Sequence, residues 1–145
     1  MRVILDGRTI QDHFLRIGRY VYNLAAALAG LPDAPDLTLL YDPAHPSSRF
    51  DLEALGRRIR LAPAPFSPFD LRSQFALPGL LRRLDADLYH ATYYVMPYAA
   101  GLPSVVTLYD AIPLAYPDSM SSPARWAYRA LNSLAGRRAR RVLTI

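Results

Sequence analysis

Short apolar runs alternate along the chain with longer stretches in which apolar residues recur at helical spacing. The short runs predict strands near residues 2–6, 37–41, 59–62, 87–91, 104–109 and 141–145. The longer stretches predict helices over residues 18–29, 70–84 and 123–139. Because strands and helices alternate, we expect an α/β fold of βαβ units around an open parallel sheet.

The ends of the predicted helices carry capping signals. Asp70 and Ser122 are suitable N-cap residues, because their side chains accept hydrogen bonds from amides of the first turn, and Pro123 suits the first helical position. Pro78 lies inside the second helical pattern and lacks a backbone donor, so we expect that helix to be split into two short pieces. Residues 43–69 are rich in Pro, Ser and Arg, and we expect one short strand in an otherwise irregular segment.

The length of 145 residues fits a single domain with one hydrophobic core. The last apolar run, residues 141–145, has no exit loop after it, and we therefore expect residues 1–145 to be a fragment of a longer protein. The sequence has no signal peptide pattern and no apolar run long enough to cross a bilayer, which favours a cytoplasmic protein.

All 17 basic residues are Arg, and the formal net charge is +5. This balance suits an anionic partner, such as a phosphate group or the inner face of a membrane touched peripherally, and equally a solvated basic surface. No nucleic-acid recognition motif accompanies the arginines, so we expect no nucleic-acid partner. There is no cysteine, and His13 and His45 have no partner at metal-ligand spacing, so we predict no metal site.

Candidate chemistry lies in the loops that follow three of the predicted strands, where open parallel sheets bind ligands. Gly18, Arg19 and Tyr20 lie where the first loop meets a helix, and a helix N-terminus attracts phosphate. The G-x-G-x-x-G spacing of a dinucleotide site is missing, which disfavours NAD. A phosphate-binding loop and a simple turn both remain open interpretations.

His90 ends the fourth predicted strand and precedes a tyrosine-rich loop, and Asp110 follows the fifth. His90 is either a ligand contact or a structural hydrogen-bonding residue. Asp110 is either a base that orients a hydroxyl or a turn acceptor. The arginines of residues 137–141 face the negative end of their helix, which we favour over a phosphate site.

Four segments in this order resemble the N-terminal half of a family 4 glycosyltransferase: residues 17–24 (IGRYVYNL), 87–92 (DLYHAT), 105–113 (VVTLYDAIP) and 140–145 (RRVLTI). The resemblance implies the GT-B arrangement, in which two Rossmann-like domains with helices on both sheet faces meet across a cleft. It also implies transfer of a sugar, with retention, from a nucleoside diphosphate sugar to an acceptor hydroxyl in polysaccharide or glycolipid assembly. No cofactor is implied, and the partners would be a C-terminal donor-binding domain and a sugar or lipid-linked acceptor.

The resemblance also implies roles for particular residues. Gly18 would let the backbone approach the donor diphosphate, with Arg19 and Tyr20 opening the helix behind it, and His90 would border the acceptor cleft. Asp110 belongs to the family's frequent His-Asp pair and would be the catalytic residue.

The chain departs from the family pattern at two positions in these segments. Tyr109 replaces the usual His of the His-Asp pair, and a single glycine, Gly18, replaces a commoner double glycine. The family's C-terminal glutamates lie beyond residue 145. We therefore expect this segment alone to be inactive, and a stand-alone binding or interaction module is the alternative interpretation.

Overall fold

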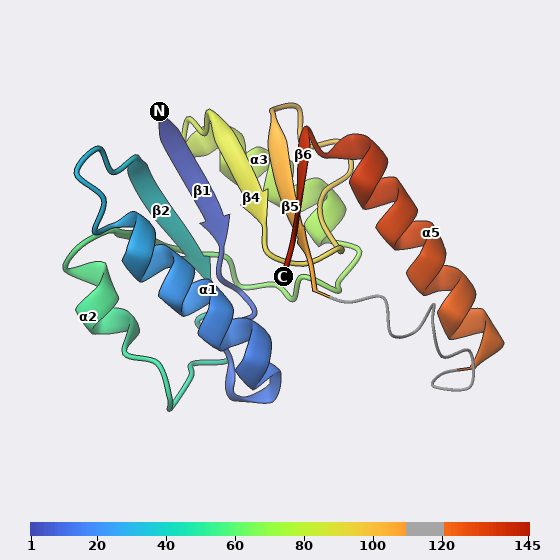
Figure 1. Cartoon of the computed structure of the whole chain (residues 1–145), viewed down its shortest axis with the longest axis horizontal. Helices are drawn as coiled ribbons and strands as arrows, with labels where there is room; N and C mark the ends of the chain where they lie inside the picture. Colours follow the sequence, from blue (N-terminus) through green and yellow to red (C-terminus); the bar gives the residue numbers. More distant parts are fainter. Residues whose placement is uncertain (110–120) are drawn as a thin grey trace.

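A computed structural model describes residues 1–109 and 121–145 and shows a six-stranded parallel sheet in the order β3-β2-β1-β4-β5-β6 (Figure 1). The strands are β1 (Arg2–Asp6), β2 (Asp36–Tyr41), β3 (Arg60–Pro63), β4 (Leu88–Ala91), β5 (Ser104–Leu108) and β6 (Arg141–Thr144). The helices are the 3-10 turn η1 (Asp12–Phe14), α1 (Leu15–Leu28), α2 (Leu52–Gly56), α3 (Ser73–Arg83) and α5 (Ser122–Arg138). The predicted strands are confirmed, each to within one residue at either end.

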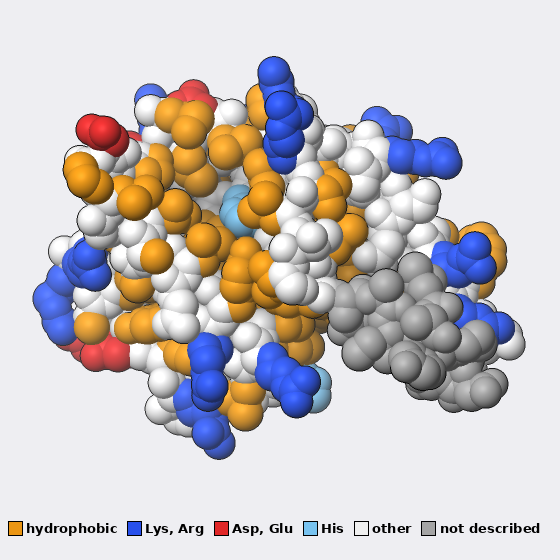
Figure 2. Space-filling view, in the orientation of Figure 1, with side chains coloured by type: hydrophobic (Ala, Val, Ile, Leu, Met, Phe, Trp, Pro, Cys, Tyr) orange, Lys and Arg blue, Asp and Glu red, His pale blue; other side chains and the backbone are white. Residues whose placement is uncertain are grey.

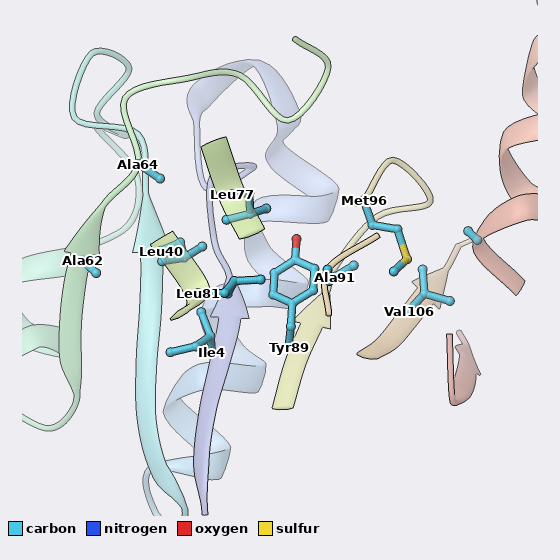
Figure 3. Packing of buried hydrophobic residues seen from close by; sticks show 12 residues of the cluster. Ile4, Leu40, Ala62, Ala64, Leu77, Leu81, Tyr89, Ala91, Met96 and Val106 are labelled. Atoms are coloured by element: carbon cyan, nitrogen blue, oxygen red, sulfur yellow. The ribbon is translucent and has the colours of Figure 1, made fainter. Parts of the chain in front are cut away.

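Alternating residues of the strands pack against helices on opposite faces of the sheet. Val3 and Leu5 of β1 share a cluster with Val21 of α1, whereas Ile4 between them shares another with Leu77 of α3. Figure 3 shows the second cluster, which fills the space between the central strands and α3. The predicted α/β Rossmann-like sheet with helices on both faces is therefore confirmed.

The two faces are covered unequally along the sheet. In Figure 1, α1 lies over the β1 and β2 side of the front face, and no described helix lies in front of β5 and β6. All four residues of β6 are exposed, and the side chains of Val142 and Leu143 are each 42% accessible.

Helix α3 differs from its prediction in two ways. It is one continuous helix although it contains Pro78, because Leu77, Pro78 and Leu81 are all buried and their packing outweighs one missing backbone hydrogen bond. It also begins at Ser73 rather than Asp70. The Asp70 carboxylate accepts the Arg72 amide at 2.9 Å within the preceding turn, so Asp70 is not the N-cap.

The starts of α2 and α5 also differ from the sequence-based predictions. Residues 43–69 contain the helix α2, which the composition obscured, and the Asp51 carboxylate caps it by accepting the Ala54 amide at 2.7 Å. Helix α5 includes Ser122, and Ser121 occupies the N-cap position without a side-chain hydrogen bond, which makes Pro123 the second helical residue. Within residues 1–109 and 121–145, no helix has the length and hydropathy needed to span a membrane.

Candidate functional site

A cleft of about 650 Å³ opens at the carboxyl edge of the sheet. Its walls come from the turn before α1 and the start of α1, from the loop after β4, and from the residues that follow β5 and β6. The lining residues are His13, Phe14, Leu15, Arg16, Ile17, Tyr93, Tyr109 and Ile145. The cleft therefore lies where open α/β sheets bind their ligands, and apolar and aromatic residues dominate its lining, as in most small-molecule sites.

A row of aromatic rings runs along this edge of the sheet. Phe14 contacts Phe69 with ring centroids 5.6 Å apart, and Phe69 contacts Tyr93 at 5.5 Å. Tyr93 lies 6.1 Å from Tyr109, which in turn meets Tyr20 edge to face at 5.5 Å. Each ring fixes the orientation of the next, so the row offers a bound molecule a rigid apolar surface with phenol hydroxyls along it.

The hydroxyl of Tyr109 is buried and has no hydrogen-bond partner among the described residues. Burial first, and then the neighbouring Tyr20 and Tyr93, raise the pKa of Tyr109 well above its ordinary value, so the phenol is neutral and keeps its proton. A buried donor without a partner costs about 1–3 kcal/mol. A ligand oxygen in the cleft is a partner that would remove this cost.

His90 is connected to the ring row through Thr107. Its Nε2 is 2.8 Å from Thr107 Oγ1, and the Tyr20 hydroxyl reaches the same Thr107 oxygen at 3.4 Å. Only 7% of His90 is exposed, and burial lowers the pKa of its ring to about 4. His90 is therefore a neutral hydrogen-bonding residue near pH 7, and it holds Thr107 and Tyr20 in place. Its contact with an acceptor stays a prediction.

Gly18 lies inside α1, which begins at Leu15, three residues earlier than predicted. A side chain at Gly18 would meet Thr9 O at 3.1 Å and the Phe50 ring at 3.2 Å, so the missing Cβ makes room for the loop after β1. Arg19, one residue later, is exposed. The approach of Gly18 and Arg19 to a donor stays a prediction, and Asp110 lies outside the described residues.

A second cluster at the carboxyl end of β1, which we call the Asp6–Arg8 cluster, is fully paired. One oxygen of Asp6 accepts Arg8 Nε at 2.9 Å, and the other accepts Arg8 Nη2 at 2.7 Å and the Tyr89 hydroxyl at 2.6 Å. The remaining Arg8 nitrogen, Nη1, donates to Ser73 Oγ at 2.8 Å and to Phe66 O at 3.2 Å. The cluster therefore ties β1 and β4 to the first turn of α3.

Asp6 and Arg8 are both charged in the fold near pH 7. Burial raises the pKa of Asp6, but the Arg8 guanidinium and the hydrogen bonds from Arg8 and Tyr89 outweigh it and hold that pKa below its ordinary value. Burial and Asp6 also raise the pKa of Tyr89, which stays a neutral donor. The sequence predicts ligand binding in the loops that follow the strands, but it assigns no separate role to Asp6, the last residue of β1, or to Arg8.

The family comparison agrees with this geometry. Residues 17–145 match the family described as "Glycosyl transferase 4-like domain". The chain belongs to this family. No curated protein and no solved structure matches the chain.

Membership agrees with the six parallel strands and with the cleft at their carboxyl edge. The resemblance to the N-terminal domain of a family 4 GT-B glycosyltransferase is thereby confirmed, and this glycosyl transferase 4-like domain is a domain of the glycosyltransferase type. Within residues 1–109 and 121–145, no group of three His, Asp or Glu side chains gathers at metal-binding distance.

Proposed function

We propose that this domain is the acceptor-side half of a retaining glycosyltransferase that acts in polysaccharide or glycolipid assembly. The new bond joins an acceptor hydroxyl oxygen to the anomeric carbon of a nucleoside diphosphate sugar. The bond from that carbon to the diphosphate oxygen breaks, and the acceptor proton leaves with the nucleoside diphosphate. A C-terminal domain would hold the donor, and no cofactor takes part.

The observation that carries this proposal is the buried Tyr109 hydroxyl, which has no partner among the described residues and belongs to a ring of the aromatic row that lines the cleft. In our proposal, the apolar faces of the acceptor pack on Tyr93 and Tyr109, and the Tyr109 hydroxyl donates a hydrogen bond to an acceptor or sugar oxygen. Such a donor suits the site because its proton stays in place across the physiological pH range. By the family resemblance, Asp110 would be the catalytic residue, and Gly18 and Arg19 would approach the donor diphosphate.

The replacement of Tyr109 by Phe in the complete enzyme tests the proposal. The loss of one hydrogen bond to the reacting complex should lower kcat/KM for the acceptor by about 10–100-fold, which corresponds to about 1–3 kcal/mol. Tyr22→Phe is the matched control, since the Tyr22 hydroxyl donates to Asp51 O, remote from the cleft lining. An unchanged kcat/KM in Tyr109→Phe, with normal folding, would remove Tyr109 from the site.

A donor-consumption assay separates catalysis from binding. Release of nucleoside diphosphate in the presence of acceptor, abolished in Asp110→Ala, supports the transferase and the catalytic role of Asp110. Saturable acceptor binding without any release of nucleoside diphosphate would instead support a binding module, and it would overturn the proposed reaction.

A further inference from the structure

Helices α3 and α5 form a basic face on one side of the sheet. Helix α3 carries Arg82 and Arg83 in its last turn, and α5 carries Arg125, Arg129, Arg137 and Arg138, whereas neither helix contains an Asp or Glu. Blue basic side chains are visible along the α5 side of the molecule in Figure 2. Because these two helices carry arginines and no Asp or Glu, their exposed sides attract anions.

Large apolar side chains protrude at the N-terminal ends of the same two helices. Phe75 is 83% exposed, Leu71 is 80% exposed and Trp126 is 73% exposed. Arginines stand beside them, with Arg72 and Arg129 both exposed. Side chains of this size are usually buried, and their clustering with arginines needs a physical explanation.

These two helix ends contact the same loop, residues 92–98. Gln74 of α3 donates to Met96 O at 2.8 Å and accepts the Tyr98 amide at 3.2 Å. Tyr128 of α5 packs edge to face on Tyr94, with ring centroids 5.1 Å apart. The protruding side chains of both helices therefore belong to one edge of the molecule. We call this edge the basic aromatic surface and define it by Leu71, Arg72, Phe75, Arg125, Trp126 and Arg129.

The α5 part of this surface is hollowed. A groove of about 590 Å³ is lined by Ser122, Arg125, Trp126, Arg129, Ala130 and Ser133. It therefore combines two guanidinium groups, small hydroxyl groups and one indole ring. Guanidinium and hydroxyl groups bind phosphate oxygens, whereas an indole ring prefers the boundary between headgroups and acyl chains.

We propose that the basic aromatic surface docks this domain on an anionic phospholipid bilayer. Trp126, Phe75 and Leu71 enter the interfacial region, and Arg125, Arg129 and Arg72 face the lipid phosphates. The Asp70 carboxylate beside this surface pairs with Arg72 at 3.2 Å, so this pair adds no net charge, positive or negative, to the surface. The combination of two arginine-bearing helices that contain no Asp or Glu with protruding apolar tips matches the charge and polarity of an anionic membrane interface.

The position of this surface also relates it to the cleft. Phe69, two residues before Leu71, belongs to the ring row that continues through Tyr93 to Tyr109. The row therefore leads from the basic aromatic surface to the cleft. A docked domain would hold this row of rings beside the bilayer. The docking itself does not depend on the transfer reaction.

Co-sedimentation of the protein with vesicles of 30% phosphatidylglycerol in phosphatidylcholine tests the docking. We expect binding at low ionic strength, a marked loss at high ionic strength because salt screens the arginines, and little binding to pure phosphatidylcholine. Trp126 is the single tryptophan of the sequence. Its emission should shift to shorter wavelength on binding and be quenched by brominated acyl chains.

Variants with the same change in charge at different positions show whether vesicle binding depends on this surface or only on the net charge of the protein. Arg129→Glu should weaken vesicle binding by about 10–30-fold, because two units of charge change at the surface and each is worth about 1 kcal/mol. Arg58→Glu makes the same change at an exposed position before β3, at the opposite edge of the sheet, and should have a much smaller effect. Trp126→Ala should weaken binding more than Leu31→Ala, which truncates another exposed apolar side chain.

Several outcomes would overturn the docking proposal. These are equal effects of Arg129→Glu and Arg58→Glu, unchanged Trp126 emission on sedimentation, and no sedimentation at low ionic strength. Binding to a DNA duplex that is stronger than binding to the vesicles, and is lost in Arg129→Glu, would assign the surface to nucleic acid instead. Thermal unfolding of each variant shows that it is folded, and transfer to a soluble acceptor without vesicles should be unaffected by Arg129→Glu.

Discussion

Two groups of polar residues lie at the same carboxyl edge of the sheet and differ in how completely they are paired. In the Asp6–Arg8 cluster, the guanidinium and carboxylate groups are bonded to each other, to Tyr89 and to Ser73. In the cleft, the Tyr109 hydroxyl is buried but has no partner among the described residues. A completed network stabilises the fold, whereas an incomplete one retains hydrogen-bonding capacity for a ligand. The comparison therefore assigns stability to the first group and recognition to the second.

The largest expected effect comes from breaking the completed network. Asp6→Asn leaves the Arg8 guanidinium buried without its counter-charge, and we expect the free energy of unfolding to fall by about 3–5 kcal/mol. At 145 residues, this loss should lower Tm by about 10 °C or more. Asp85→Asn is the control, because it removes an exposed ion pair with Arg2 and should leave Tm almost unchanged. Equal Tm values for the two variants would show that the Asp6–Arg8 cluster does not stabilise the fold.

A pH titration of stability tests the residues that support the cleft, because His90 bonds Thr107 beside it. Its ring has a pKa of about 4 in the fold, against about 6.5 when unfolded, so the unfolded chain binds a proton first as the pH falls. Stability should be full above pH 6.5, and about 3 kcal/mol should be lost as the pH falls from 6.5 to 4.

The control for this titration is a variant that cannot bind the proton. His90→Gln should flatten the curve between pH 6.5 and pH 4. Chemical denaturation at a series of pH values measures both curves. Coincidence of the His90→Gln and wild-type curves would show that His90 does not control acid stability.

Gly7 lies between Asp6 and Arg8 and allows their close approach to β2. A Cβ at Gly7 would meet Leu39 Cδ1 at 2.5 Å and the Leu40 carbonyl oxygen at 2.6 Å, so Gly7→Ala forces the backbone of β1 or β2 to shift. We expect a loss of about 1–3 kcal/mol in chemical denaturation. Gly136→Ala, in α5, places its Cβ in open space and should instead stabilise by about 0.5–1 kcal/mol. A free energy of unfolding for Gly7→Ala that is no lower than that of the wild type would contradict the close packing.

The strands of the sheet could be predicted from the sequence because each strand of a buried parallel sheet is a short apolar run, which can be recognised without knowing its partners. The sequence placed candidate residues at the carboxyl edge for the same reason, since His90 and Tyr109 lie near the ends of such runs and Asp110 follows one. It failed at Pro78 and at α2, where burial of Leu77 and the cap at Asp51 outweigh local composition.

The pairing within the site could not be predicted at all. The bond from Arg8 to Ser73 joins residues 65 positions apart, and only the folded chain shows that Tyr109 lacks a partner. Sequence patterns indicate which residues reach the edge of the sheet. They do not indicate which of those residues already have hydrogen-bond partners within the fold.

The same chemical change at two tyrosines gives the finest test of the comparison. Tyr89→Phe removes a hydrogen bond of 2.6 Å to a buried carboxylate, and we expect a loss of about 1.5–3 kcal/mol in the free energy of unfolding. Tyr109→Phe removes a hydroxyl with no partner among the described residues, so stability should stay unchanged or rise by up to about 1 kcal/mol. Chemical denaturation of the two variants measures the difference. A loss in Tyr109→Phe as large as that in Tyr89→Phe would mean that the Tyr109 hydroxyl is already bonded within the fold and is not available to a ligand in the cleft.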